Sequence, residues 1–436
     1  MKKPNKSREL ILEGITMHLK CISLTEIKKL YDERFKAYEL SRRDKKLVKF
    51  LTYAIIRNRG VIENILSSLL IRKLPSKRLE IKAGLMIGIS QILFTRIENY
   101  AAVSSSVDLF EKKLLKWRSL ANALLRKVSK NSKKNSEYLA NSEIYVPNWI
   151  NLSWKKQFGN TTYLAIVKTL KTIPDIDLRI KDETEIKVIS EKLNAKMLSS
   201  KSIRIKKSGL IKHLDGYEAG KWWVQDIAAQ LPVMALGKIE GKSVIELCAA
   251  PGGKTAQLLD MGASVLAVDI SKRKVKKLIN NIARINLSKN LKVLSEDARK
   301  WMPDKKSDMV LLDVPCSATG TIRKNPDVIW NRQEKDISNL VKRQKQLLEN
   351  AIKMTNKNGI IVYSNCSIQF EEGEKIIADF LKNKKVVLDD LKSEEILDYP
   401  KEIFKKGYIR TLPIYYKNFG EMDGFFIARL RKISDN

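Results

Sequence analysis

Five short apolar runs in the second half of the chain constrain its fold more than any other feature of the sequence. The runs cover residues 243–247, 265–268, 291–294, 309–312 and 360–363. Helix-like stretches separate them, and Val275, Leu278 and Ile282 show the helical spacing of apolar residues. Short buried strands that alternate with helices form a parallel sheet, because each helix returns the chain to the same edge. The pattern predicts a Rossmann-like, doubly wound α/β domain over residues 216–436.

The first apolar run leads into a loop of small residues that ends in a lysine. The loop is Cys248, Ala249, Ala250, Pro251, Gly252, Gly253 and Lys254. Small side chains let a ligand approach the backbone, and the N–H groups of the following helix face that ligand. A phosphate loop of the GxxxxGK type is excluded because Cys248 stands where a glycine is required, and GxGxxG is absent.

Acidic residues follow the next three runs, at Asp269, Asp297 and Asp313. Ligands of doubly wound sheets bind beyond the carboxyl ends of the strands, where Asp269 could accept hydrogen bonds from both hydroxyls of a ribose. Asp297 could accept the amino group of an adenine. Any one of these residues could simply cap a helix. Together, beside the small-residue loop, they favour an adenosyl nucleoside without a pyrophosphate, and this points to S-adenosylmethionine as the cofactor.

Two cysteines follow adjacent predicted strands, Cys316 in Pro-Cys-Ser-Ala-Thr-Gly and Cys366 in Asn-Cys-Ser. Both should open into one cleft next to the predicted methyl donor. The C5 atom of a pyrimidine is too electron-poor to attack a methyl sulfonium. A thiolate that adds to C6 makes C5 nucleophilic, which is covalent catalysis. The residues alone do not decide which cysteine attacks.

A basic segment with a terminal aromatic follows the first of these cysteines, over residues 321–330. Arg323 and Lys324 could hold phosphates, and Trp330 could stack on a base of single-stranded RNA. The alternative is a surface loop that a packed Trp330 anchors.

The N-terminal part is predicted to be helical and strongly basic. The chain of 436 residues carries a net charge of +34, and residues 1–140 hold 31 Lys and Arg against 13 Asp and Glu. Such a surplus indicates a polyanionic partner, and we expect RNA. The polar stretch over residues 129–142 is typical of a linker, and a small α/β segment with a helix at 163–170 and a strand at 203–205 follows it.

Other classes of protein and site are excluded by what the sequence lacks. Four cysteines in a chain this long make no disulfide framework. With two histidines and no CxxC pair, we expect no metal site. No apolar run reaches the length of about 18 residues that a membrane span needs. We therefore expect a cytoplasmic protein without a membrane partner.

The motifs together resemble a known enzyme family. Residues 247–255, 313–317, 323–330, 365–367 and 423–428 are similar to the Sun/NOL-type RNA cytosine-C5 methyltransferases. Segments 44–57, 100–108 and 122–127 resemble the NusB-like helical domain of the branch that modifies bacterial 16S rRNA. The resemblance implies an all-α NusB-like RNA-binding domain over 1–135, an RNA-contacting α/β domain over 147–215, and a class I methyltransferase domain over 216–436.

The resemblance also implies roles for the candidate residues. The loop from Cys248 to Lys254, together with Asp269, Asp297 and Asp313, would line the S-adenosylmethionine pocket. Cys366 would be the nucleophile and Cys316 would assist release of the methylated product. Two positions depart from the family pattern, since Asn365 replaces a frequent threonine and Glu296 replaces a glycine.

The expected function is therefore methylation of C5 of a cytosine in 16S rRNA by a monomeric enzyme. Two alternatives stay open. The same chemistry could act on tRNA or on another rRNA cytosine, or the chain could be an inactive NusB-like RNA-binding factor.

Overall fold

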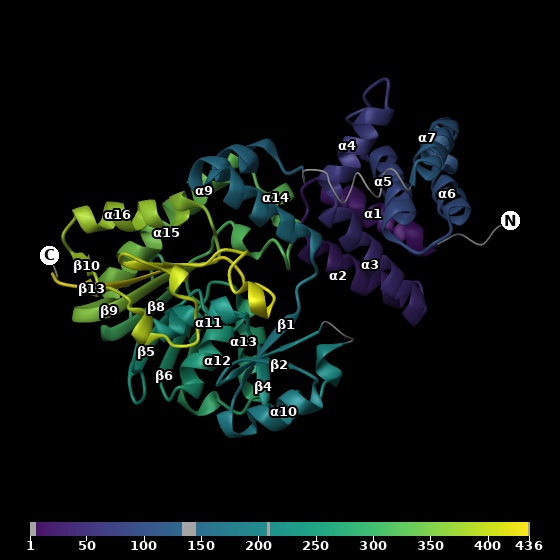
Figure 1. Ribbon diagram of the computed structural model, residues 1–436. Helices are drawn as coiled ribbons and strands as arrows, with labels where there is room; N and C mark the ends of the chain where they lie inside the picture. Colours follow the sequence, from purple (N-terminus) through teal and green to yellow (C-terminus); the bar gives the residue numbers. More distant parts are fainter. Residues whose placement is uncertain (1–5, 133–144, 207–209, 435–436) are drawn as a thin grey trace. The chain divides into compact units, whose positions relative to one another are not determined.

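The computed structural model describes residues 6–132, 145–206 and 210–434. These residues form two compact units, which are coloured along the sequence in Figure 1. The first contains the residues up to Thr172 together with Asn325–Gln333, and the second contains Ile173–Lys324 and the chain from Glu334 onward. A short segment of the second half of the sequence thus belongs to the first unit.

The first unit is helical, as predicted. Its longer helices are α1 (Lys6–Leu19), α2 (Leu24–Ala37), α3 (Arg42–Arg57), α4 (Arg59–Leu69), α5 (Leu79–Phe94), α6 (Asn99–Val107), α7 (Arg118–Lys130) and α9 (Asn148–Lys168). The short helix α14 (Val328–Asn331) comes from the segment Asn325–Gln333. Helix α9 is kinked at Gly159, which has a φ of 78°.

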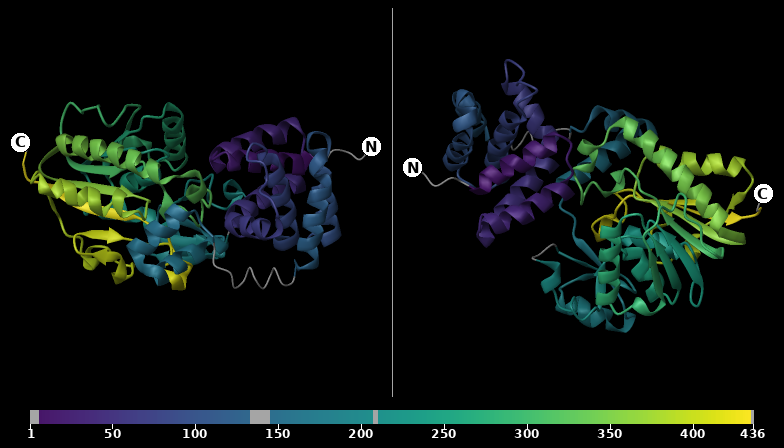
Figure 2. Two further views of the ribbon diagram at one scale, coloured as in Figure 1. Left: turned by 90° about the horizontal axis from the view of Figure 1, so that it is seen from above. Right: turned by 180° about the vertical axis from the view of Figure 1, so that it is seen from behind.

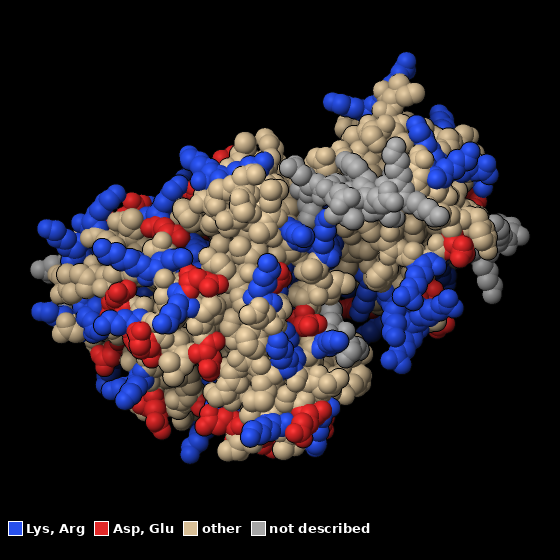
Figure 3. Space-filling model, viewed as in Figure 1, with Lys and Arg blue, Asp and Glu red and all other residues tan. Residues whose placement is uncertain are grey.

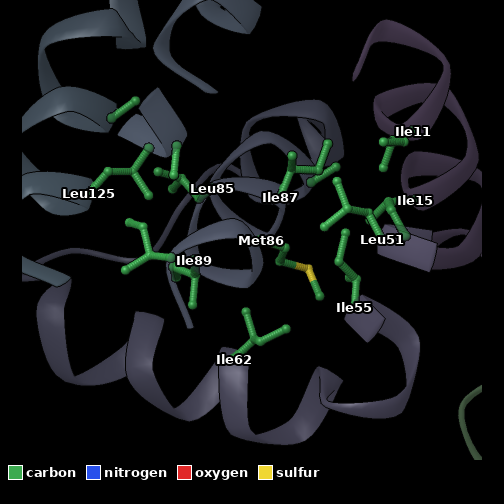
Figure 4. Packing of buried hydrophobic residues seen from close by; sticks show 14 of the residues in the cluster. Ile11, Ile15, Leu51, Ile55, Ile62, Leu85, Met86, Ile87, Ile89 and Leu125 are labelled. Atoms are coloured by element: carbon green, nitrogen blue, oxygen red, sulfur yellow. The ribbon is translucent and has the colours of Figure 1, made fainter. Parts of the chain in front are cut away.

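Helix α5 forms the centre of the first unit. Eleven of its sixteen residues are buried, because apolar residues occupy every side of the helix rather than one stripe. Figure 4 shows Met86 and Ile87 of α5 surrounded by Ile15, Leu51 and Ile55 from neighbouring helices. A helix that is apolar all round is stable only when other helices cover it, so the bundle folds around α5.

Two glycines let neighbouring side chains reach the backbone of α5. A Cβ atom added at Gly88 would lie 2.5 Å from Leu125 Cδ2, and one at Gly84 would lie 2.7 Å from Phe110 Cζ. Gly88→Val is therefore expected to lower the free energy of unfolding by about 1–3 kcal/mol, the usual cost of overpacking a core. Urea unfolding followed by circular dichroism measures this, with Ala123→Val at an exposed position of α7 as the control. Equal effects of the two valines would contradict the packing explanation.

The second unit contains two sheets, and the smaller one is antiparallel. Its strand order is β2-β3-β1-β4, with β1 (Ile176–Ile180), β2 (Lys196–Ser199), β3 (Ser202–Ile205) and β4 (Trp222–Val224). Helix α10 (Ile186–Lys192) packs against β3. Strand β3 matches the strand predicted at 203–205, whereas the helix predicted at 163–170 lies at the end of α9 in the first unit.

Among the described residues, the larger sheet has nine strands in the order β11-β12-β13-β9-β8-β5-β6-β7, with β10 paired to β13. Five strands are parallel: β5 (Ser243–Leu247), β6 (Ser264–Val268), β7 (Leu291–Leu294), β8 (Ser307–Asp313) and β9 (Thr355–Asn365). An antiparallel extension follows β9: β13 (Phe426–Lys432), β12 (Tyr408–Arg410), β11 (Phe404–Lys405) and β10 (Val386–Leu388). The five strands predicted from the sequence are the five parallel ones.

Helices cover both faces of the parallel strands, as Figures 1 and 2 show. One layer consists of α11 (Ile227–Met234), α12 (Gly253–Asp260) and α13 (Lys272–Arg284), and the other of α15 (Glu334–Met354) and α16 (Glu374–Lys382). Val244 faces the first layer and Ile245 the second, in keeping with the two-residue period of a strand. The predicted doubly wound α/β fold is confirmed, and the antiparallel extension makes its sheet a mixed one.

The helices and strands do not test two predictions, namely the linker over residues 129–142 and the positions of the domain boundaries. Most of the predicted linker over residues 129–142 lies outside the described residues, while Ser129 and Lys130 end α7. The domain boundaries at 135, 147 and 215 stay predictions. No helix within the described ranges is long and apolar enough to cross a membrane.

Candidate active site

The loop after β5 has a backbone that requires small residues. Cys248 adopts a φ of 61°, and Gly252, which caps α12, adopts a φ of 99°. A Cβ atom at Gly252 would lie 2.9 Å from Leu278 Cγ, so any side chain there would be strained and would meet α13. The glycine therefore allows close packing of the loop against α13.

Asp269 lies directly after β6 and holds this loop in place. Its carboxylate accepts hydrogen bonds from the backbone N–H of Ala250 at 3.2 Å and of Ser271 at 2.9 Å. Burial, followed by the charges of Asp269 and Asp313, raises the pKa of the Cys248 thiol. The carboxylates predicted from two strand ends therefore both act on the loop, and Cys248 stays a neutral thiol.

Asp297 is engaged by a neighbour. Its carboxylate accepts two hydrogen bonds from Arg299 Nε, at 2.9 and 3.1 Å, and one from Arg299 Nη2 at 2.5 Å. These hydrogen bonds lower the pKa of Asp297 and keep it ionised. Its charge also acts on Cys248, so Asp297 belongs to the same end of the sheet as Asp269.

Asp313 at the end of β8 forms an ion pair with Lys254 at the start of α12. Lys254 Nζ donates to Asp313 Oδ2 at 2.7 Å, and Ser364 Oγ donates to Asp313 Oδ1 at 3.1 Å. Burial alone would lower the pKa of Lys254, but the charges of Asp313 and Cys366 raise it. The lysine is therefore a permanent cation that interacts with both the carboxylate and the cysteine.

Cys316 and Cys366 meet as their positions on adjacent strands predict. The two Sγ atoms lie 3.4 Å apart, and both cysteines are free thiols. The hydrogen bond to Cys366, burial and electrostatic interactions with Cys366 and Glu372 raise the pKa of Cys316 well above its ordinary value. Cys316 therefore keeps its proton more firmly than an exposed cysteine does.

The residue before Cys366 makes hydrogen bonds that fix the backbone on both sides of the cysteine. Asn365 Oδ1 accepts from Ser367 N–H at 2.9 Å, and Asn365 Nδ2 donates to the Glu372 carbonyl at 2.8 Å. A threonine hydroxyl would have to donate and accept through a single oxygen, whereas the asparagine amide uses two separate atoms for these contacts. The departure from the family pattern at this position is accommodated by these bonds.

Comparisons with known proteins agree with this geometry. The family model described as 16S rRNA methyltransferase RsmB/F matches residues 233–431, and that of the NusB family matches residues 5–130. Ribosomal RNA small subunit methyltransferase B of Photorhabdus laumondii is 31% identical over 410 residues, which cover 90% of this chain and 92% of that protein. The chain belongs to this RsmB family of methyltransferases. The resemblance to Sun/NOL-type enzymes and to a NusB-like domain is thereby confirmed.

Solved structures share the fold of this RsmB-family chain. The crystal structure of PH0851 has a TM-score of 0.75 and 24% identity, and covers 99% of this chain and all of that one. NSun6 from Pyrococcus horikoshii, crystallised with SFG, has a TM-score of 0.56 and 22% identity, and covers 66% of this chain and 99% of that one. At these identities the likeness establishes the fold alone.

The basic segment after Cys316 has internal partners in this RsmB-family protein. Arg323 is 1% exposed and ion-pairs with Glu421 and Asp423, both at 3.5 Å. Lys324 Nζ donates to Asp423 Oδ2 at 2.9 Å and also to Asp226. The two cations, which could have held phosphates, are instead matched by carboxylates of the second unit.

The segment Asn325–Gln333 is anchored in the first unit. Trp330 packs against the helical core, and the Arg59 guanidinium lies 4.5 Å from its ring centroid. Asp327 Oδ2 accepts a hydrogen bond from the N–H of Leu24, the first residue of α2, at 2.9 Å. Trp330 therefore anchors its segment by packing against the helical core, as the alternative interpretation of the sequence proposed, and is not a free platform for stacking a base.

Sequence reasoning missed two features of the site. The Lys254–Asp313 ion pair joins residues that the sequence placed in one pocket without pairing them. The carboxyl of Glu372 lies buried beneath both cysteine loops. Its one sequence signal is the acidic pair Glu371 and Glu372 shortly after Cys366, where acidic residues before a helix are common. No group of three His, Cys, Asp or Glu side chains within the described residues could hold a metal ion.

Proposed function

We propose that the chain methylates C5 of a cytosine in 16S rRNA, with S-adenosylmethionine as the methyl donor and a covalent cysteine–C6 adduct as the intermediate. The observation that carries the proposal is the pair of thiols 3.4 Å apart, next to the Lys254–Asp313 ion pair. The rRNA substrate is supported by the relative from Photorhabdus laumondii, whose name gives ribosomal RNA of the small subunit as its substrate.

The residues around the β5 loop fit an adenosyl cofactor. From Cys248 up to the lysine, the loop contains only cysteine, alanine, proline and glycine, so an extended ligand can lie along its backbone. Asp269 would accept the ribose hydroxyls and Asp297 the adenine amino group, while Asp313 would lie toward the methionine part. When bound, S-adenosylmethionine supplies an electrophilic methyl group.

The chain's own residues would prepare the cytosine. Cys366, as a thiolate, would add to C6, and the Lys254 ammonium, which interacts electrostatically with Cys366, would favour this step. Asp313 would accept a hydrogen bond from the cytosine amino group. After methylation a base must accept the C5 proton, so that the electrons of the C5–H bond re-form the C5–C6 double bond and the C6–sulfur bond breaks to return the Cys366 thiolate. Cys316 would assist this release.

The target base must leave any stack to reach the two thiols. We propose that the domains of residues 1–135 and 147–215 hold the surrounding RNA and that the protein acts as a monomer. Figure 3 shows Lys and Arg side chains gathered over α2 and α3 and over α6 and α7, with few acidic side chains among them. Affinity that depends on phosphate contacts should fall steeply with salt, because each contact releases counterions.

The test is a methylation assay with the full-length protein, S-adenosylmethionine carrying a radiolabelled methyl group, and either unmodified small-subunit rRNA or unmodified tRNA. We expect label in 5-methylcytosine after nuclease digestion, at one cytosine, with binding weakened about 1,000-fold or more between roughly 50 and 200 mM salt. Label in tRNA only would show that the enzyme carries out the same chemistry on tRNA and not on 16S rRNA. Cofactor and RNA binding without label in any RNA would contradict the proposal and favour the RNA-binding factor.

A further inference from the structure

A buried carboxylate lies beneath the two cysteine loops and is not explained by the reaction itself. Glu372 ends the short 3-10 turn Phe370–Glu372 after β9 and is fully buried. Its Oε1 accepts hydrogen bonds from Ser317 N–H and Gln344 Nε2, both at 2.9 Å. Its Oε2 accepts from Ser317 Oγ at 2.5 Å and from Ser367 Oγ at 2.6 Å.

The two serines on this carboxylate are the residues that follow the two cysteines. Ser317 follows Cys316 and Ser367 follows Cys366, so a single carboxylate ties both loops together. The main chain of Glu372 is fixed as well, because its carbonyl accepts from Tyr363 Oη at 2.7 Å and from Asn365 Nδ2 at 2.8 Å. The distance between the thiols is therefore set by hydrogen bonds that converge on Glu372.

The charge of Glu372 also acts on the site. Within the described part of the chain, hydrogen-bond donors rather than a cation surround its carboxylate. Its negative charge contributes to the raised pKa of Cys316, after the hydrogen bond to Cys366 and burial. Burial is the main cause of the raised pKa of Tyr363, and the charge of Glu372 is the next. The nearby Arg410 donates a hydrogen bond to Glu374 at 3.0 Å.

We propose that Glu372 is a positioning residue that fixes the spacing of the Cys316 and Cys366 loops and makes the two thiols differ in reactivity. The inference rests on the proposed two-cysteine reaction, since it gives the two thiols different tasks. A purely structural role for Glu372 would affect stability without changing which cysteine reacts.

The variant Glu372→Gln separates charge from shape. The amide oxygen can still accept from Ser317 N–H and Gln344, and the amide NH₂ can donate to the two serine hydroxyls, which then accept. The hydrogen-bond count is thereby kept while the negative charge is removed. Glu371→Gln is the matched control, because Glu371 is the adjacent residue, pairs with Lys375 at 2.8 Å, and is not among the groups that shift the pKa of Cys316.

The test measures alkylation of the two thiols by iodoacetamide in the free protein between about pH 6 and pH 10, a range that brackets the ordinary thiol pKa. Mass spectrometry of the cysteine peptides gives the ratio of Cys366 to Cys316 labelling. We expect Glu372→Gln to lower this ratio at least several-fold near neutral pH, because loss of the negative charge lowers the pKa of Cys316, and Glu371→Gln to leave the ratio unchanged. An unchanged ratio in Glu372→Gln would overturn the role of the charge.

Should Glu372→Gln fail to fold, Ser367→Ala tests the spacing. This variant removes one bond to Glu372 and keeps the charge, and we expect oxidation of the Cys316–Cys366 pair to a disulfide by diamide to slow at least several-fold. An unchanged oxidation rate would overturn the spacing role. Neither measurement needs RNA, so an enzyme that responds as expected but methylates no cytosine would refute the proposed function and leave the positioning role intact.

Discussion

Cys366→Ala is expected to form no covalent RNA adduct and to lose methyl transfer by about 10,000-fold or more, the scale on which removal of a nucleophile acts. Cys316→Ala is expected to accumulate an adduct, because Cys366 still adds to C6 while release of the product is impaired. The physical basis is the pair of thiols at 3.4 Å, of which Cys366 interacts with the Lys254 cation and Cys316 holds its proton. Denaturing gels of each variant with S-adenosylmethionine and rRNA fragments measure the adduct.

Cys21→Ala serves as the control for these variants, since Cys21 is an exposed thiol of the first unit and should behave as wild type. An adduct that appears only with Cys366→Ala would reverse the two roles. Methyl transfer retained by both single variants would refute the covalent mechanism, whatever RNA is used.

Glu246→Gln is expected to remove a large pH dependence of stability. Glu246 lies in β5 shortly before the loop of Cys248 to Lys254, is fully buried, and accepts a hydrogen bond from Thr255 Oγ1 at 2.6 Å. Burial raises the pKa of Glu246 from its ordinary 4.5 to about 8. The folded protein therefore keeps a proton that the unfolded chain releases, and the free energy of unfolding falls as the pH rises from 4.5 toward about 8. The loss is about 1.4 kcal/mol per pH unit, or about 3 kcal/mol between roughly pH 5 and pH 7.5.

Urea unfolding at about pH 5 and about pH 7.5 measures this effect as the change in stability of each variant between the two conditions. Between these two pH values the free energy of unfolding of wild type should fall by about 3 kcal/mol more than that of Glu246→Gln, because the amide does not titrate. Glu240→Gln is the control, since Glu240 is an exposed carboxyl shortly before the same strand and should follow wild type. Parallel pH dependences of wild type and Glu246→Gln would contradict the assignment of this proton to Glu246.

The period of the apolar residues was sufficient to predict the helical first unit and the parallel sheet of the second unit, but not the smaller antiparallel sheet. Strands β5, β6, β7 and β8 were predicted within two residues of their bounds, because a buried strand is a short apolar run, whereas β9 begins five residues before its predicted start, in a polar stretch. The antiparallel strands β10 to β12 were not predicted. They have two or three residues each, and so short a run shows no period.

The sequence by itself determined which residues meet at the carboxyl edge of the parallel sheet. Asp269, Asp313, Cys316 and Cys366 follow consecutive or neighbouring strands, and parallel strands bring such positions together whatever the intervening chain does. The roles of Arg323, Lys324 and Trp330 could not be predicted in this way. Their partners are distant in sequence, and a basic residue has the same appearance in a sequence whether it binds a phosphate or a buried carboxylate.

Only the tertiary structure decided which carboxylates serve the site and which serve the fold. Glu372 and Glu246 are ordinary acidic residues in the sequence, yet both are fully buried. Burial changes what a carboxyl does, because removal of water makes it either bind a proton, as at Glu246, or collect hydrogen-bond donors, as at Glu372. That environment arises from packing between segments far apart in the chain, and no local pattern of residues records it.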